Sequence, residues 1–336
     1  MKSILGGLLA ASVLALAALA PAQAEIREKT FRLGLQTNLD TAQGQGVQKF
    51  ADLVAQKSGG KLKVQIFPGG ALGGDLQTIS ALRGGTVDMT VLATSTLVGL
   101  VKEFSLFDLP FAFPSDAAAM AVIDGPFGTR VRAGLAEKGI VSLGYWGAGY
   151  RHLTNSRREI TKLEDVKGLK IRVLQNPLYV DLWTALGANA VPMPFPEVYT
   201  ALEQKTVDGQ ENPLATIVSA KLFEVQKYFS FTRHIYFLTS LQFSKPIWDT
   251  LNDDEKKVLT DAAAEAQANW RATTLADDAK LAEQMKASMT MTEIAPAEMA
   301  RFREAVKPVV EKYSALADPA AVKDFFESLD KFNAKK

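Results

Sequence analysis

The chain has 336 residues, no cysteine and a formal net charge of +1, with 47% hydrophobic and 22% charged residues. Without cysteine there are no disulfides, thiolate metal sites or thiol catalysis, so a large hydrophobic core must hold the fold together. A near-neutral protein gives no electrostatic reason to expect nucleic acid or anionic lipid as a partner. The length suits two domains.

The first 24 residues have the pattern of a secretory signal peptide. Lys2 precedes a run of apolar and small residues that ends in an A-x-A site, Ala22-Gln23-Ala24. We therefore expect cleavage after Ala24, a neutral mature chain from about Glu25, and a periplasmic location. The alternative is an uncleaved anchor, but the stretch is short and alanine-rich for a helix that needs about 20 strongly apolar residues to span a bilayer. No later stretch is long and apolar enough to cross one.

The mature chain begins with alternating strands and helices. Alternating apolar and polar residues predict three strands, at residues 30–35, 61–67 and 87–92. Helices are predicted between them, from an apolar stripe over residues 46–57 and from an N-cap at Asp75 to residue 82. A polar turn over residues 36–40 and a glycine-rich loop over residues 68–74 follow the first two strands. This order predicts βαβ units and a mostly parallel sheet.

The second half of the chain repeats this design. A strand over residues 169–174, a helix over residues 197–202 and a strand from residue 207 are predicted. The pattern A-L-x-x-x-T-V-D stands at a helix-to-strand junction in both halves, at residues 81–88 and 201–208. We therefore expect two similarly built α/β domains, residues 25–149 plus about 237–275 and residues 150–236 plus about 276–336.

A long helix is predicted from Asp253 to about Met289, because this stretch has a capping start and no proline or glycine. At 1.5 Å per residue it would be roughly 50 Å long, longer than one small domain is wide. Such a helix would lie across both domains and tie them together. The alternative is two helices, broken near Thr273-Thr274.

Arg172 is the first candidate for ligand binding. It lies near the C-terminal end of a predicted strand, before the turn that starts at Gln175, and ligands of open α/β sheets bind outside the carboxyl ends of strands. A guanidinium presents two parallel N–H groups to a carboxylate, which lysine cannot do. From the pattern alone, a solvated charge on the strand is an equally good interpretation.

Arg151 and Asn212 are further candidates. Arg151 follows a strand that runs into a glycine-rich turn, where Trp146 or Tyr150 can form a pocket wall. Its alternative is a segment that crosses between domains with ordinary aromatic packing. Asn212 belongs to the polar run V-D-G-Q-E-N-P over residues 207–213, and its amide can donate to a carboxylate or hydroxyl. The more common interpretation of such a run is a polar turn.

Other kinds of site find little support. The glycines of residues 69–74 do not match G-x-G-x-x-G, and no Walker lysine follows them. His152 and His234 lack metal-ligand spacing on one helix, and no G-x-S-x-G elbow is present. Asp208 and Glu211 lie in one turn, so they do not form a pair of catalytic acids on opposite sides of a scissile bond. We therefore expect no cofactor, no metal and no enzymatic activity.

Several of these motifs together resemble a known family. They are K-I-R-V at residues 170–173, P-M-P-F-P-E-V-Y at residues 192–199, V-D-G-Q-E-N-P at residues 207–213 and L-G-G-D at residues 72–75. The sequence resembles the DctP-type solute-binding subunit of TRAP (tripartite ATP-independent periplasmic) transporters over essentially the whole mature chain.

The resemblance implies an α/β, two-domain periplasmic binding protein fold, with a hinge and a long helix spanning both domains. It implies that Arg172 is the main carboxylate anchor and Arg151 a second contact, that Asn212 adds a hydrogen bond and that Phe195 packs beside the ligand. The opposite domain would contribute the polar turn with Gln36 and Asn38. Gln175, Trp146 and Tyr236 complete the predicted ligand-binding set. The partners implied are a small organic acid and the TRAP membrane permease subunits, and we expect a monomer that hydrolyses nothing.

One departure narrows the ligand. Residues 93–96, Ala-Thr-Ser-Thr, carry no charge, which argues against a sialic-acid-like or amine-bearing ligand. Nearby aromatic residues suit an organic acid with an apolar or hydroxylated body. The candidates left open are 2-hydroxy or 2-keto monocarboxylates, sugar acids and C4-dicarboxylates. Two rival functions also stay open, an exported α/β enzyme and a binding protein that feeds a sensor.

Overall fold

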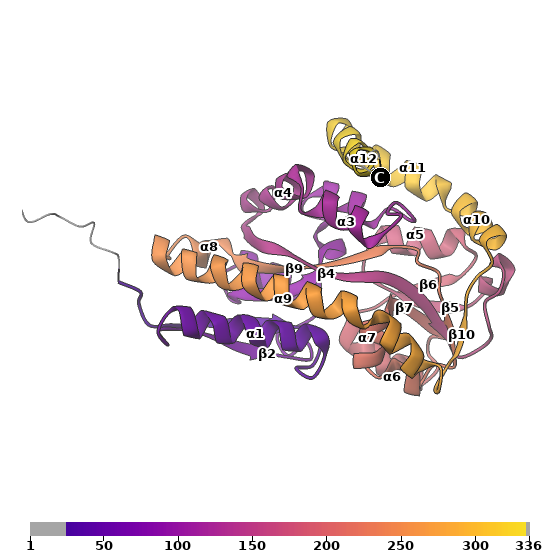
Figure 1. Ribbon diagram of the computed structural model, residues 1–336, viewed down its shortest axis with the longest axis horizontal. Coiled ribbons are helices and arrows are strands. Elements are labelled where there is room, and N and C mark those ends of the chain that lie inside the picture. Colours follow the sequence, from indigo (N-terminus) through magenta and orange to yellow (C-terminus); the bar gives the residue numbers. More distant parts are fainter. Residues whose placement is uncertain (1–24, 334–336) are drawn as a thin grey trace, which may run out of the picture.

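The computed structural model describes residues 25–333, apart from the side chains of residues 148, 273–279 and 333. The predicted signal peptide therefore lies outside the described residues. Strands form one mixed sheet in the order β2-β1-β3-β9-β4-β7-β5-β6, and β10 and β8 branch from β4. Helices cover the sheet along its length (Figure 1). The predicted α/β class is confirmed.

The first lobe contains three parallel strands, β1 (Lys29–Leu35), β2 (Leu62–Phe67) and β3 (Met89–Ala93), joined by helices α1 (Ala42–Lys57) and α2 (Asp75–Arg83). Phe31, Leu33 and Leu35 of β1 are buried in one core with Val47 and Phe50 of α1. Helix α1 begins earlier than predicted because the Thr41 hydroxyl caps it, accepting from Gly44 N at 2.9 Å. Helix α2 is capped by Gly74, so the prediction that Asp75 is the N-cap is wrong by one residue.

The second lobe contains the parallel strands β5 (Lys170–Val173), β6 (Asn189–Pro192) and β7 (Gly209–Pro213), with helices α5 (Pro177–Ala185), α6 (Val198–Glu203) and α7 (Leu214–Ser219). Residues 209–213 are thus a buried strand, and their interpretation as a polar turn is wrong. Gln210, Glu211 and Asn212 are buried there because β7 lies between β5 and β4.

The repeated A-L-x-x-x-T-V-D pattern makes the same contacts in both lobes. The carboxylate of Asp88 accepts a hydrogen bond from Arg32 N in β1 at 2.7 Å, and that of Asp208 accepts from Lys170 N in β5 at 2.9 Å. In both copies the threonine N–H donates to the alanine carbonyl at 2.9 Å. Each aspartate therefore satisfies a backbone donor of a neighbouring strand.

Two long strands cross between the lobes. In β4 (Ile140–Asn155) the first part pairs with β9 (Tyr236–Ser244), and the last part pairs with β7 and with β8 (Tyr228–Ser230). The predicted glycine-rich turn is wrong, because residues 147–149 form only a shift of register inside β4. The predicted domain boundaries at residues 149/150 and 236/237 fall in these crossing strands, and they stay a prediction.

Helix α9 (Asp253–Met285) is one continuous helix of 33 residues. It packs on α1 of the first lobe, on β4 and on α7 of the second lobe, and Figure 1 shows it lying across both. The prediction of a long helix that ties the lobes together is confirmed, and the alternative of a break near residues 273–274 is wrong. None of the helices within residues 25–333 is long and apolar enough to span a membrane.

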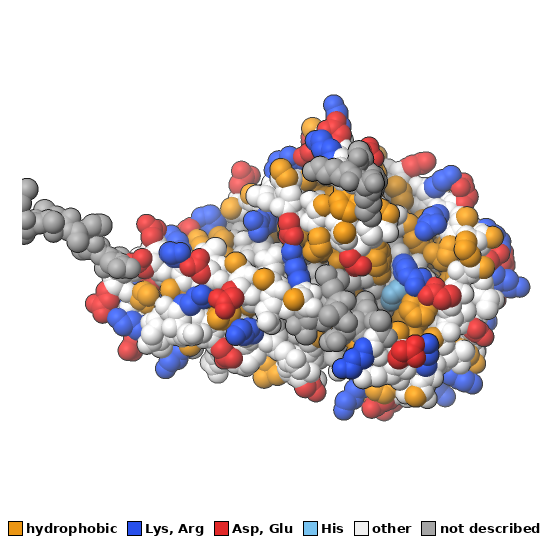
Figure 2. Space-filling view, in the orientation of Figure 1, with side chains coloured by type: hydrophobic (Ala, Val, Ile, Leu, Met, Phe, Trp, Pro, Cys, Tyr) orange, Lys and Arg blue, Asp and Glu red, His pale blue; other side chains and the backbone are white. Residues whose placement is uncertain are grey.

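The remaining elements are α3 (Asp116–Ile123), α4 (Pro126–Ala133), α8 (Lys245–Trp248), β10 (Thr290–Thr292), α10 (Pro296–Ala305), α11 (Lys307–Leu316) and α12 (Pro319–Asn333). Helix α11 packs on α5, and α12 returns to pack on α3 and α4. There the ring of Phe325 meets those of Phe113 and Phe127 edge-on, at centroid distances of 5.7 and 5.4 Å. On the face in Figure 2, basic and acidic side chains are interspersed, as the neutral overall charge leads one to expect.

We predict that Gly44→Ala destabilises the protein, because the new Cβ would lie 2.3 Å from the carbonyl oxygen of Asn38 and 2.5 Å from Leu39 Cα. Such overpacking costs about 1–3 kcal/mol of the free energy of unfolding. Urea denaturation measures this loss. The matched control is Gly99→Ala, since a Cβ at Gly99 meets nothing within 4 Å; equal stability of the two variants would contradict the prediction.

Candidate functional site

A cleft opens between the two lobes, with an empty space of about 690 Å³ including its open mouth. Gln36 and Asp75 line it from the first lobe, Arg172 and Asn212 from the second, and Trp270 from α9. Of the Lys, Arg and His residues that the structure describes, Arg172 alone lines this cleft, and Asp75 is its one acid. One guanidinium and one carboxyl group thus face a cleft that has no other ionisable side chain among its described lining residues.

Arg172 lies in β5 and is 1% exposed, which excludes a solvated charge on the strand. Its Nε and Nη2 donate to the carbonyl of Met193 at 3.0 and 2.5 Å, while Nη1 is buried with no hydrogen-bond partner in the described structure. The ring of Phe195 lies 5.9 Å from its Cζ. Burial lowers the pKa of Arg172 to about 10, so the guanidinium is cationic at neutral pH.

Asp75 is a cleft residue whose role sequence reasoning missed. It stands in the first turn of α2, and its Oδ1 is buried without a partner. Burial raises the pKa of this carboxyl to about 7, and the charge of Arg172 opposes the rise. The sequence signal was present, since Asp75 closes the L-G-G-D motif, but there it suggested only a helix cap.

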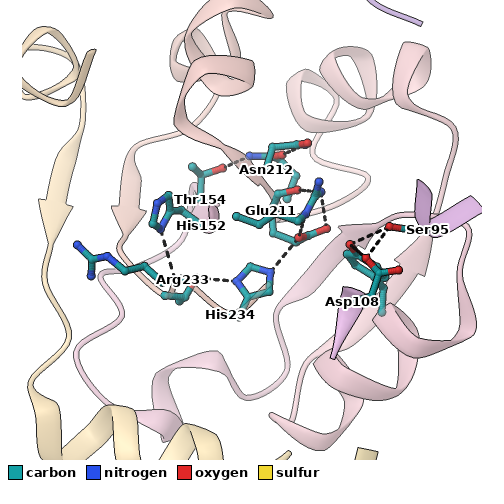
Figure 3. A network of polar contacts seen from close by, with 12 residues as sticks. Ser95, Asp108, His152, Thr154, Glu211, Asn212, Arg233 and His234 are labelled. Carbon is teal, nitrogen blue, oxygen red and sulfur yellow. Dashed lines mark hydrogen bonds and ion pairs between the residues drawn. The ribbon is translucent and has the colours of Figure 1, made fainter. Parts of the chain in front are cut away.

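Gln36 and Asn212 are held by hydrogen bonds that fix their amides. Gln36 donates from Nε2 to the carbonyl of Gly73 at 3.1 Å, which leaves its buried Oε1 without a partner. Asn212 donates from Nδ2 to Gln210 at 2.5 Å, and Gln210 donates to Thr154 at 2.9 Å (Figure 3).

The structure brings four of the predicted site residues to one cleft. They are Gln36, Arg172, Phe195 and Asn212.

Arg151 does not line this cleft, and its Nη1 is buried with no hydrogen-bond partner in the described structure, so its predicted ligand contact stays a prediction. Its guanidinium forms a buried ion pair with Glu211 on the neighbouring strand, including an Nη2 to Oε1 bond of 2.8 Å. The ring of Phe237, which lines the cleft, covers its Cζ at 4.4 Å. Phe237 and Trp270 are cleft residues that sequence reasoning missed, because their distance along the chain gave no signal.

Four other predicted residues do not line this cleft. Trp146 is fully buried against Trp270, at a centroid distance of 5.1 Å, so it supports the wall from behind. Tyr236 packs edge-on against Tyr150, also at 5.1 Å, in the core. Asn38 lines a neighbouring hollow, and Gln175 lies at separate hollows near α5. In this structure Trp146 and Tyr236 make packing contacts, and their predicted ligand contacts stay a prediction.

A buried polar network stands behind the cleft (Figure 3). Glu211 also pairs with His234 Nε2 at 2.9 Å, and despite burial Arg151 and His234 keep the pKa of Glu211 below its ordinary value. Close by, Asp108 accepts from Ser95 at 2.9 Å and from Tyr179 at 3.2 Å, while its Oδ2 is buried without a partner. Burial raises the pKa of Asp108 to about 7.

The profile of the DctP family, described as bacterial extracellular solute-binding protein, family 7, matches residues 33–316. This chain belongs to the DctP family. A TRAP periplasmic solute-binding protein from Ochrobactrum anthropi is 47% identical, with a TM-score of 0.81 over 93% of this chain and 98% of that one. The sugar acid binding protein DctPAm from Advenella mimigardefordensis, solved with galactonate, is 40% identical, with a TM-score of 0.88 over 91% of this chain and 99% of that one.

A further DctP relative is the 2,3-diketo-L-gulonate-binding periplasmic protein YiaO of Escherichia coli, 38% identical over 77% of this chain and 79% of YiaO. The family confirms the two-domain periplasmic binding protein fold. It also confirms that this DctP protein is a solute-binding component of a transporter and not an enzyme.

We predict that Asp108→Asn flattens the dependence of stability on pH. Between its unfolded pKa near 3.8 and its folded pKa of about 7, Asp108 keeps a proton in the folded state that the unfolded chain has lost. Raising the pH through this window therefore lowers the free energy of unfolding of the wild type. The variant lacks this carboxyl group and does not lose stability for this reason. From pH 4.5 to 7.5 the wild type should lose at least about 1 kcal/mol relative to the variant, since one pKa unit is about 1.4 kcal/mol.

Urea denaturation at the two pH values measures this difference. The control is Asp330→Asn, which changes an exposed carboxyl on α12. If Asp108→Asn and Asp330→Asn follow the same pH curve, Asp108 is not the titrating group.

Proposed function

We propose that this DctP-family protein captures a small organic anion in the cleft between its lobes and delivers it to the membrane permease of a TRAP transporter. In this proposal Arg172 binds the ligand carboxylate, Asn212 adds a hydrogen bond and Phe195 packs against the ligand body. The observation that carries the proposal is the buried cation Arg172, which lines the cleft and whose Nη1 has no hydrogen-bond partner in the described structure.

The geometry of Arg172 supports a carboxylate ligand. Guanidinium has five N–H donors, and the Met193 carbonyl engages Nε and one position of Nη2. The Nη1 edge thus remains for an acceptor with two oxygens. Because the site is buried, the pairing acts at lower local dielectric than in water, which strengthens it.

The relatives support the same class of ligand and the same location. DctPAm was solved with galactonate, and YiaO binds 2,3-diketo-L-gulonate; both ligands are carboxylates. YiaO is a periplasmic protein. We propose that this chain is also periplasmic, and that its signal peptide is cleaved after Ala24.

We predict that Arg172→Ala weakens carboxylate binding at least tenfold, because removing one partner of a desolvated charge pair costs about 2–5 kcal/mol. Arg172→Lys should also weaken it substantially, since an ammonium cannot form two parallel hydrogen bonds. A thermal-shift screen of organic acids finds a ligand first, because ligand at 100 times its Kd adds about 2.7 kcal/mol of stability. Titration calorimetry with that acid then compares the variants.

The matched control is Lys170→Ala, which removes an exposed cation from the same strand. It should leave the affinity unchanged. Equal affinity of wild type and Arg172→Ala would remove Arg172 from the site.

A further inference from the structure

Four buried side-chain atoms of cleft-lining residues have no hydrogen-bond partner within the described structure. Two are donors, Nη1 of Arg172 and Nε1 of Trp270, and two are acceptors, Oε1 of Gln36 and Oδ1 of Asp75. An unmet buried polar group costs about 1–3 kcal/mol, so such atoms are rarely left without partners. Their mixture favours a ligand that both accepts and donates hydrogen bonds.

The two acceptors are fixed in the first lobe, opposite Arg172. The Nε2 to Gly73 bond of 3.1 Å orients the Gln36 amide, so its free end is the oxygen. Asp75 follows Gly73 by two residues, in the first turn of α2. No ion pair joins Asp75 to Arg172, although the charge of Arg172 acts on the Asp75 carboxyl. A ligand group can therefore stand between the acceptors and the guanidinium.

The charge of the cleft limits the charge of the ligand. Among the described lining residues Arg172 is the one cation and Asp75 the one acid. Arg151 does not line the cleft, and Glu211 balances its charge, although its Nη1 has no hydrogen-bond partner in the described structure. One carboxylate finds a partner in Arg172, but a second would enter a buried space that holds a carboxyl group and no further cation.

We propose that Gln36 and Asp75 form a hydroxyl-binding subsite, and that the cleft therefore selects a hydroxylated monocarboxylate, a sugar acid, over hydroxyl-free acids and simple dicarboxylates. This inference rests on the proposed function, since it takes Arg172 as the carboxylate anchor. A hydroxyl group donates to Gln36 or Asp75 and can accept from Trp270. A ketone or a second carboxylate only accepts, and it would leave both protein oxygens without partners.

The first test compares ligands on the wild-type protein by titration calorimetry. The probes are the sugar acids D-erythronate, D-gluconate and D-galactonate, the hydroxyl-free acids hexanoate and pyruvate, and the dicarboxylate succinate. We expect the best sugar acid to bind at least tenfold more tightly than hexanoate, pyruvate and succinate. Tighter binding of succinate or pyruvate, or no binding of any sugar acid, would overturn the inference.

The second test uses Asp75→Asn, which keeps the shape of the side chain and removes its charge. Hydrogen bonds to charged groups are stronger than neutral ones, so sugar-acid affinity should fall about tenfold. The ratio of sugar-acid to succinate affinity should narrow, because the repulsion of a second carboxylate is gone. The control is Asp52→Asn, an exposed carboxyl on α1, and circular dichroism checks that both variants are folded.

The two proposals fail in different ways. If Arg172→Ala abolishes binding while Asp75→Asn leaves the affinity ratio unchanged, the hydroxyl subsite is wrong and the anchor stands. If Arg172→Ala binds every acid as tightly as the wild type does, the proposed function of the cleft is wrong as well.

Discussion

A buried guanidinium whose hydrogen-bonding capacity is only partly met is the constraint on which the site depends. Arg172 is held by the Met193 carbonyl, its side chain lines the cleft, and its Nη1 has no partner in the described structure. A buried charge in this condition is unfavourable unless an acceptor completes it. In the proposed function a ligand carboxylate would supply this acceptor, and the relief of the unfavourable burial would favour the bound state.

A second arginine, Arg151, lies close to the cleft, but its charge is balanced inside the protein. Glu211 neutralises Arg151, and Phe237 separates Arg151 from the open space. The two arginines thus differ in their surroundings, since Arg172 lines the cleft and Arg151 packs behind Phe237. Asn212 and Glu211 are neighbours in β7, so this strand supplies one residue to the cleft and one to the ion pair behind it.

The sequence was enough to predict the order of strands and helices, the long helix and the arginine of the cleft. The periodicity of apolar residues and the helix caps are local signals, and they predict the strands and helices. The K-I-R-V strand together with V-D-G-Q-E-N-P is a specific motif, and it points to the arginine. The roles of Trp146 and Arg151 could not be read in this way, since each depends on partners such as Trp270 and Glu211 that are far along the chain. The place of Asp75 in the cleft was missed because an acidic residue at a helix start is already explained by its effect on the helix end.

The duplicated T-V-D turn has a consequence for movement. Asp88 and Asp208 each accept a hydrogen bond from a backbone N–H of a strand in their own lobe. Neither of these bonds joins one lobe to the other. A rotation of one lobe against the other about β4 and β9 would therefore leave both bonds intact. In such a motion a ligand that binds one arrangement better than the other would shift the balance between them, and the bonds inside each lobe would stay as they are.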